Sequence, residues 1–202
     1  MTRAEESGLI KRVTGGDADA FEPFVLEHGK KIYNLALRML GNEHDAQDAS
    51  QEAFLRAFGS LSSFRGDCKF SVWLYRLTTN ICIDMIRSRD VTTVPIDGDE
   101  GDETPRAPEI PDTRYSPETE FEKKELRDAV RHGLERLSPE HRRILLLREI
   151  SGLSYEEIGT ALELEPGTVK SRIFRARQLL CGFLEETGNI PPRLPSKDTR
   201  EV

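Results

Sequence analysis

Apolar residues recur every three or four positions along most of the chain, a spacing typical of helices that bury one face. Between residues 21 and 40 this stripe consists of Phe21, Phe24, Val25, Ile32, Leu35, Ala36, Met39 and Leu40. Residues 45–58 and 70–89 repeat the pattern, and Asp17 is placed to cap the first helix. Because no stretch alternates apolar and polar residues as a half-buried strand does, the sequence predicts an all-α fold.

A second group of helices is predicted towards the C-terminus. Ser138-Pro139 is typical of a helix start, with serine as the N-cap and proline in the first turn. Ser154 and Glu157 have the spacing of a capping box, which begins a short helix. A long helix then begins at Pro166. A short helix, a tight turn and a long helix together form the helix-turn-helix pattern.

An acidic, proline-rich segment lies between these two helical regions. The chain of 202 residues has a formal net charge of −7, and residues 95–120 alone hold nine acids, two bases and five of the eleven prolines. Such a segment cannot bury enough apolar surface to fold, so we expect a flexible acidic linker there. The sequence thus predicts two small helical domains, at 9–94 and 121–187, and an unstructured tail at 188–202.

The composition excludes several classes of protein. The longest aliphatic run has four residues, 144–147, whereas a membrane helix needs about 18. The opening residues, MTRAEESG, lack the apolar stretch of a secretory signal. Three widely spaced cysteines and four scattered histidines offer neither a disulfide framework nor a metal or catalytic site. We expect a cytoplasmic protein that does not insert into a membrane, is not an enzyme and needs no metal or cofactor.

The helix that begins at Pro166 has two different faces. Its buried stripe is predicted to be Val169, Ile173, Ala176, Leu180 and Phe183, and opposite it lie Lys170, Ser171, Phe174, Arg175 and Gln178. From Pro166 to Leu184 there are four bases and no acid. This pattern favours a helix that lies in the major groove of DNA. The alternative is a charged face without a partner.

The helix at 70–89 carries a second candidate surface. Trp73, Arg76, Asn80 and Arg87 form a line beside its apolar stripe, after a loop at 64–69 that contains the glycine of a tight turn. An aromatic ring, an amide and guanidinium groups suit the stacking and hydrogen bonding of unpaired bases. The alternative is that Trp73 lies in the core and that the arginines face solvent.

Taken in order, these segments resemble the extracytoplasmic-function (ECF) sigma factors of bacterial RNA polymerase, a group of the sigma-70 family. In the N-terminal region the resemblance rests on DASQEAF at 48–54, FRGD at 64–67, WLYR at 73–76, Asn80 and Ile83-Asp84. In the C-terminal region it rests on GLSYEEIG at 152–159 and GTVKSRIFRAR at 167–177. Both helical regions are covered, with an unmatched linker between them.

The resemblance implies a dissociable polymerase subunit that selects promoters. The polar face of the 45–58 helix would by itself indicate only a solvated surface, but the family implies that it binds core polymerase through Asp48, Gln51, Glu52 and Arg56. Capture and melting of the −10 element are implied for Phe64, Lys69, Phe70, Trp73, Arg76 and Asn80. Recognition of the −35 element is implied for Tyr155, Thr168, Lys170, Ser171, Arg172, Phe174, Arg175 and Arg177.

The family also implies an inhibitory partner for this chain and a position for its linker on the polymerase. An anti-sigma factor would inhibit the chain and could hold it at the inner membrane, and the acidic linker would run near the polymerase's RNA exit path. The main alternative is a helix-turn-helix regulator that acts without core polymerase. Such regulators carry a receiver or ligand domain of alternating strands and helices, which this sequence does not predict. A module whose basic helix binds protein would differ by lacking salt-sensitive DNA binding.

Overall fold

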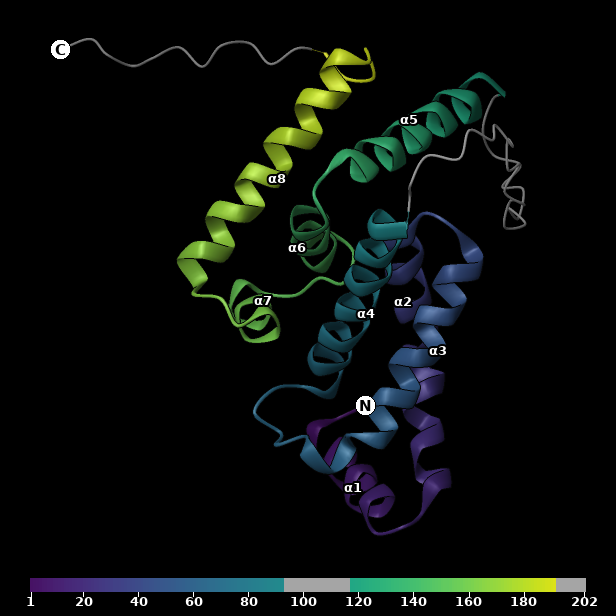
Figure 1. The fold of residues 1–202 in the computed structure, drawn as a ribbon, viewed down its shortest axis with the longest axis vertical. Helices are drawn as coiled ribbons and strands as arrows, with labels where there is room; N and C mark the ends of the chain where they lie inside the picture. The colour runs from purple at the N-terminus through teal and green to yellow at the C-terminus, as the bar shows by residue number, and fades with distance from the viewer. Residues whose placement is uncertain (93–116, 192–202) are drawn as a thin grey trace, which may run out of the picture.

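The computed structural model describes residues 1–92 and 117–191, and within these residues every regular element is a helix (Figure 1). The α-helices are α1 Arg3–Thr14, α2 Glu22–Leu40, α3 Glu43–Gly59, α4 Phe70–Thr92, α5 Pro117–Arg136, α6 Pro139–Glu149, α7 Tyr155–Leu162 and α8 Pro166–Glu186. Short 3₁₀ helices at Ala18–Phe21 and Leu61–Ser63 connect some of them. The predicted all-α fold is confirmed.

Helices α2, α3 and α4 pack on one another and form the N-terminal unit, with α1 at one end (Figure 1). The stripe predicted for α2 is buried at Phe24 and Ile32, whereas Val25 is 39% exposed. The prediction that Asp17 caps this helix is wrong. Its carboxylate makes no capping bond and instead accepts two hydrogen bonds from the guanidinium of Arg12. The apolar stripe, and not a cap from Asp17, therefore positions the beginning of α2.

An aromatic cluster joins the beginning of α2 to the beginning of α4. Phe70 is fully buried, and its ring centroid lies 4.2 Å from that of Phe24 and 5.7 Å from that of Trp73. The Trp73 ring in turn lies 5.0 Å from the half-buried ring of Phe64. Aromatic pairs at such separations stabilise a core beyond the area that they bury. The cluster therefore holds the loop at 64–69 against α4.

Helices α5 to α8 form the C-terminal unit, and the helix starts predicted there are confirmed. Ser138 caps α6, since its hydroxyl accepts a hydrogen bond from the His141 N–H. At the start of α7 the Ser154 hydroxyl accepts from the Glu157 N–H at 3.1 Å, and the Glu157 carboxylate accepts from the Ser154 N–H at 2.9 Å. This reciprocal pair is the predicted capping box. Helix α8 begins at Pro166, as predicted.

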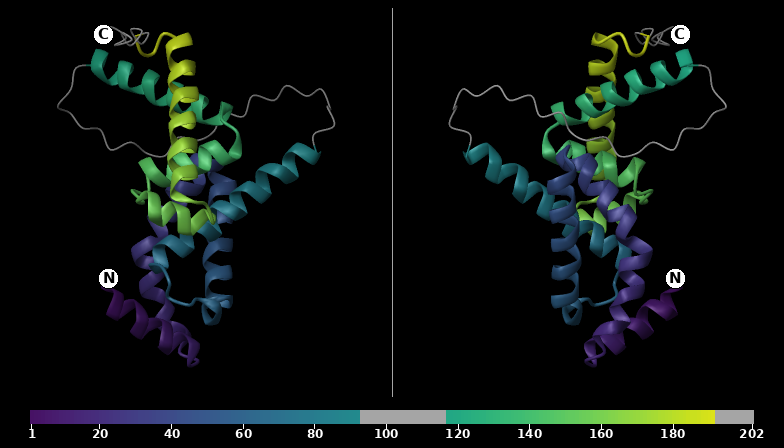
Figure 2. Two further views of the ribbon diagram at one scale, coloured as in Figure 1. Left: turned by 90° about the vertical axis from the view of Figure 1, so that its left-hand side faces the viewer. Right: turned by 90° about the vertical axis from the view of Figure 1, so that its right-hand side faces the viewer.

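The two units pack against each other (Figures 1 and 2). Helix α4 contacts α7, α2 contacts α6, and buried residues from both units form one continuous core. At this boundary the side chain of Arg142 on α6 is only 8% exposed in spite of its charge. Its guanidinium donates hydrogen bonds to the carbonyl oxygens of Met39, Leu134 and Glu135. One cation thus binds the C-terminal ends of α2 and α5, where helix dipoles favour positive charge.

The bounds of the two units differ from the expected 9–94 and 121–187. A capping box of Thr2 and Glu5 starts α1 at Arg3, and Leu9 then packs against the core. Helix α5 begins at Pro117, so the last four residues of the expected 95–120 linker are helical. Proline suits the first turn of a helix, where its missing N–H is not needed. Residues 95–116 of the linker and 192–202 of the tail lie outside the described residues.

Candidate nucleic-acid interface and docking groove

Helix α8 is anchored by the apolar stripe predicted for it. Val169, Ile173 and Ala176 are almost completely buried where α8 packs against α6 and α7. The stripe ends at buried Leu184, whereas Phe183 remains half-buried beneath the guanidinium of Arg136, 5.2 Å from its ring centroid. Because the apolar side of α8 is buried, its basic side faces solvent.

The outer face of α8 is exposed and carries positive charge. The exposed side chains on it that were predicted to meet DNA are Lys170, Ser171, Arg172, Phe174, Arg175 and Arg177. Phe174 is 61% exposed, although a ring of this size is usually buried. Thr168 is half-buried, and its carbonyl accepts a hydrogen bond from the Ser171 hydroxyl at 3.0 Å. The face offers guanidinium and ammonium groups for phosphates and base edges, beside an apolar ring.

Tyr155 and Arg177 lie at the edge of this face and are held by neighbours. The guanidinium of Arg148 lies 5.0 Å from the centroid of the Tyr155 ring. Arg177 donates from Nε to Glu149 Oε1 at 3.0 Å, and this hydrogen bond raises the pKa of its guanidinium. Both side chains are therefore oriented before any partner arrives.

The turn between α7 and α8 is fixed by a close backbone contact. A Cβ placed on Gly159 would lie 2.7 Å from the carbonyl oxygen of Leu164, so only glycine fits there. The Leu164 N–H donates to the Gly159 carbonyl at 2.9 Å. Glu163 closes α7 in the left-handed region, at φ 56°, where a residue with a side chain is strained. These contacts set the angle at which α8 leaves α7.

The surface predicted to capture the −10 element divides into a buried part and an exposed part. Phe70 and Trp73 belong to the aromatic cluster, so in this structure their rings face the core and not a base. The reason is that Phe24 packs against Phe70, and the rings of Phe64 and Phe70 pack against Trp73. Lys69 and Asn80 are exposed and Arg76 is half-exposed.

Basic side chains along α4 pair with acids of the C-terminal unit. Lys69 Nζ lies 2.9 Å from Glu157 Oε1, and this interaction raises the pKa of the lysine. Arg76 Nη1 lies 3.1 Å from Glu163 Oε1, at the C-terminal end of α7. A third pair joins Arg87 to Glu140 on α6 at 3.4 Å. Sequence spacing gave no signal for these pairs, because each joins residues more than 50 positions apart.

A groove of about 410 Å³ lies between α3 and α4 and contains most of the residues expected to bind polymerase. Its lining residues are Asp48, Ala49, Glu52, Arg56, Ile81, Asp84, Met85 and Ser88. Within it the Arg56 guanidinium donates to the Glu52 carboxylate at 2.7 Å. Gln51 is exposed on α3 and is not part of the lining. Sequence reasoning missed the contribution of Asp84, which faces α3 only because α3 and α4 pack together.

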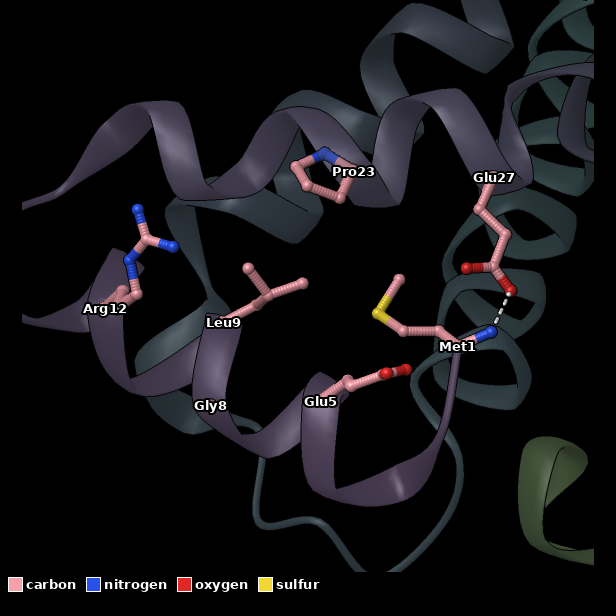
Figure 3. A pocket seen from close by; sticks show the side chains of 7 residues that line it. All are labelled: Met1, Glu5, Gly8, Leu9, Arg12, Pro23 and Glu27. Carbon is pink, nitrogen blue, oxygen red and sulfur yellow. Dashed lines mark hydrogen bonds and ion pairs between the residues drawn. The ribbon is translucent and has the colours of Figure 1, made fainter.

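A larger hollow, of about 510 Å³, lies between α1 and α2 (Figure 3). Leu9 and Pro23 form its apolar part, and the N-terminal amine of Met1 bonds to Glu27 Oε1 at 3.2 Å on its rim. None of the residues expected to bind DNA or polymerase lines it. The hollow is therefore separate from the candidate interfaces.

Two of the cysteine thiols have a raised pKa. Burial raises the pKa of the half-buried Cys68 thiol in the loop before α4, and it raises the pKa of Cys82 to about 12. A raised pKa lowers the fraction of thiolate, which is the reactive form. Burial thus keeps both thiols mainly in the protonated form.

Comparisons with known proteins match both units to one family. Residues 24–92 match the family Sigma-70 region 2, and residues 127–180 match Sigma-70, region 4. The chain is 37% identical over 192 residues to the RNA polymerase sigma-H factor of Pseudomonas aeruginosa, covering 92% of this chain and 96% of that protein. It is 40% identical over 174 residues to the ECF RNA polymerase sigma factor SigW of Bacillus subtilis, covering 85% and 92% respectively. The chain belongs to the sigma-70 family, in its ECF group.

The fold of this sigma factor also matches that of a solved relative. The match to the sigma factor RpoE of Bartonella quintana covers 82% of this chain and 96% of that chain, with a TM-score of 0.60 and 23% identity. In that structure RpoE is in complex with the anti-sigma factor NepR. Members of the family are transcription initiation factors and not enzymes. Among the described residues of the sigma factor, no helix combines the length and apolarity needed to cross a membrane.

Proposed function

We propose that this sigma factor binds core polymerase through the α3–α4 groove, captures the melted −10 strand along α4 and reads the −35 duplex with α8. The observation that carries the proposal is the exposed face of α8, which is basic and free of acids and is held outwards by a buried stripe. Lys170 and Arg175 would contact base edges, and Tyr155 and Arg177 would contact phosphates and set the register.

The α3–α4 groove suits a helical partner with basic and apolar residues. Carboxylates of Asp48, Glu52 and Asp84 lie on it, and Ala49 and Met85 add apolar surface. Basic residues of the polymerase would pair with the carboxylates while its apolar residues cover Met85. Gln51 would contact the polymerase beside the groove rather than within it.

At the −10 element the exposed polar groups of α4 would act on the unpaired strand. Lys69 and Arg76 supply positive charge for phosphates, and Asn80 offers an amide to a base edge. The half-buried Phe64 ring is available for partial stacking, while Phe70 and Trp73 would support it from the core. All bond formation would belong to the polymerase, and the sigma factor needs no cofactor or metal for these contacts.

We further propose that the protein works in the cytoplasm and that an anti-sigma factor is a partner. Support for the location is that Cys68 and Cys82 are free thiols, which a reducing compartment would preserve. Support for the partner comes from the solved relative, which was crystallised with one. A membrane-bound inhibitor would hold the protein at the inner membrane.

Transcription by core polymerase on fragmented genomic DNA tests the proposal. With the protein present, mapped 5′ ends should show new start sites that share two spaced upstream elements. No new start sites, together with no binding to core polymerase, would overturn it and favour a helix-turn-helix regulator that acts alone.

The groove can be tested by neutralising two of its acids. Glu52→Ala with Asp84→Ala should weaken binding to core polymerase roughly tenfold, because the basic residues of the polymerase would lose the carboxylates with which they are proposed to pair. The measurement is a titration of core polymerase with labelled protein. Asp19→Ala with Glu22→Ala removes the same types of residue from exposed positions outside the groove and should leave affinity unchanged. Equal affinities for the two variants would remove the groove assignment.

Reading by α8 can be tested at one arginine. Arg175→Ala should cost about 1–3 kcal/mol on the −35 element and relax specificity there, since the guanidinium can no longer contact base edges. The measurement is holoenzyme binding to the mapped promoters with single-base changes in that element. Arg131→Ala, on α5, is the matched control and should bind as the wild type does. Retention of full −35 specificity by Arg175→Ala would contradict the assignment.

A further inference from the structure

Arg143, on α6, carries a half-buried guanidinium with an unsatisfied nitrogen. Its Nε is almost inaccessible to solvent and has no hydrogen-bond partner among the described residues. The acid one turn before it on α6, Glu140, pairs with Arg87 of α4 at 3.4 Å instead. A buried polar atom without a partner is costly, and in folded proteins such an atom calls for a bound ion or water. Arg143 is therefore expected to bind a group that the described residues do not supply.

Two further arginines lie near Arg143. Glu140 and Arg143 are three residues apart and share one face of α6, and the Glu140–Arg87 pair shows that this face is turned towards α4. Burial lowers the pKa of the Arg143 guanidinium. The positive charges of Arg76 and Arg87 lower it further, against the opposing effect of Glu140. A negatively charged partner would relieve the repulsion among these like charges.

The ion pairs of the described residues do not balance the charge of Arg76, Arg87 and Arg143, which we name the arginine cluster. Arg87 pairs with Glu140, and Arg76 pairs with Glu163 at 3.1 Å. Three guanidiniums are thus accompanied by two carboxylates, which leaves one positive charge in excess. The side chain of Arg87 is 67% exposed, whereas that of Arg76 is 35% exposed. A small anion can therefore reach the cluster from the Arg87 side.

We propose that the arginine cluster binds a small anion made of linked phosphate groups, which contacts Arg143 and the arginines of α4. A guanidinium matches the oxygens of a phosphate with two parallel hydrogen bonds. Arg76 and Arg87 are eleven residues apart, which is about 16 Å along α4, so a chain of phosphates contacts more of the cluster than one phosphate does. The inference does not rest on the proposed function, because that function assigns no role to Arg143.

Calorimetric titration of the full chain with tripolyphosphate tests the site, in magnesium-free buffer at a fixed chloride concentration. Arg143→Met keeps an unbranched side chain without the guanidinium and should weaken binding roughly 10- to 100-fold, through the loss of charged hydrogen bonds. Arg131→Met, at an exposed position on α5, is the control with the same change in charge and should bind as the wild type does. Binding by the basic face of α8 is common to both variants and cancels. Equal affinities of the two variants would overturn the site.

Two other anions define the ligand. Inorganic phosphate should bind more weakly than tripolyphosphate, and equal affinities would overturn the assignment to linked phosphates. ATP adds a nucleoside to the same chain of phosphates and so separates two sources of the ligand. Tighter binding of ATP than of tripolyphosphate would support a nucleotide, whereas equal or weaker binding would support an inorganic polyphosphate.

Thermal unfolding gives a second readout of the same variants. Without added anion, Arg143→Met should be at least as stable as the wild type, because it no longer buries an unsatisfied nitrogen. With tripolyphosphate, the wild type and Arg131→Met should unfold at a higher temperature, and Arg143→Met should shift less, since a ligand stabilises only the state that binds it. A less stable Arg143→Met protein in the absence of anion would show that the guanidinium is already satisfied, against the proposal.

Discussion

At the scale of single residues, Arg142 shows how backbone carbonyl oxygens can accommodate a buried charge. Burial lowers the pKa of its guanidinium, yet three carbonyl oxygens accept its hydrogen bonds. Charged hydrogen bonds to helix ends are stronger than neutral ones and offset part of the desolvation. Loss of this side chain would leave the carbonyls of two helix ends without a partner, in the middle of the contact between the units.

His28 presents the opposite case, a buried titratable group whose Nε2 has no hydrogen-bond partner. Desolvation lowers its pKa from 6.5, and Lys31 and the N-terminal amine lower it further, against the opposing effect of Glu27. The unfolded chain therefore binds a proton at His28 more readily than the folded chain does. The free energy of unfolding should therefore have its full value above about pH 6.5 and should decrease as the pH falls below that value.

Urea unfolding at pH 7.5 and pH 5.5 measures this effect. His28→Leu should lose less stability between the two pH values than the wild type, because it has no group to protonate at that site. The exposed His44, which pairs with Asp48, is present in both proteins and so cancels in the comparison. An identical decline in both proteins would show that His28 does not cause it.

At the scale of elements, the angle between α7 and α8 depends on a glycine. The Gly159 Cα lies so close to the Leu164 carbonyl that a methyl group would collide with backbone atoms, which cannot move as a side-chain end can. Gly182, within α8, has nothing within 4 Å of the place of a Cβ. The two glycines are therefore expected to respond in opposite directions to the same substitution.

Gly159→Ala should destabilise the C-terminal unit by about 1–3 kcal/mol and weaken binding to the −35 element, because α8 must shift to relieve the overlap. Gly182→Ala should stabilise it by about 0.5–1 kcal/mol, because alanine has the higher helix propensity. Thermal unfolding of both variants measures the difference. A stable Gly159→Ala protein with normal −35 binding would show that the turn is more adaptable than this geometry implies.

Much at this scale could be predicted from the sequence, because capping and stripe formation are local. Ser138, Ser154 and Pro166 mark helix starts where their spacing indicates. In the predicted stripe of α8, Val169, Ile173 and Ala176 are buried, whereas Leu180 and Phe183 are half-buried. Predictions from local patterns were wrong where a side chain contacts another element of the fold. Trp73 stands beside the stripe of α4 on a helical wheel, but its ring packs against Phe64 and Phe70 in the aromatic cluster and is buried. Asp17 failed as a cap because Arg12, one turn before it, binds its carboxylate.

At the scale of the whole molecule, the arrangement of the two units could not be predicted. The ion pairs Arg76–Glu163 and Lys69–Glu157 join residues 87 and 88 positions apart, and no periodicity relates residues at such separations. Sequence spacing likewise does not relate Asp84 to Glu52, which line the same groove only because α3 packs on α4. The candidate surfaces were predicted one helix at a time, and their relation to each other required the structure.

Three ion pairs between α4 and the C-terminal unit, Lys69–Glu157, Arg76–Glu163 and Arg87–Glu140, lie at the solvent-exposed rim of the contact between the units. Pairs of this kind are individually weak and are screened by salt. The apolar core beneath them is not screened in this way. Raising the salt concentration is therefore expected to loosen the relative orientation of the two units before it separates them.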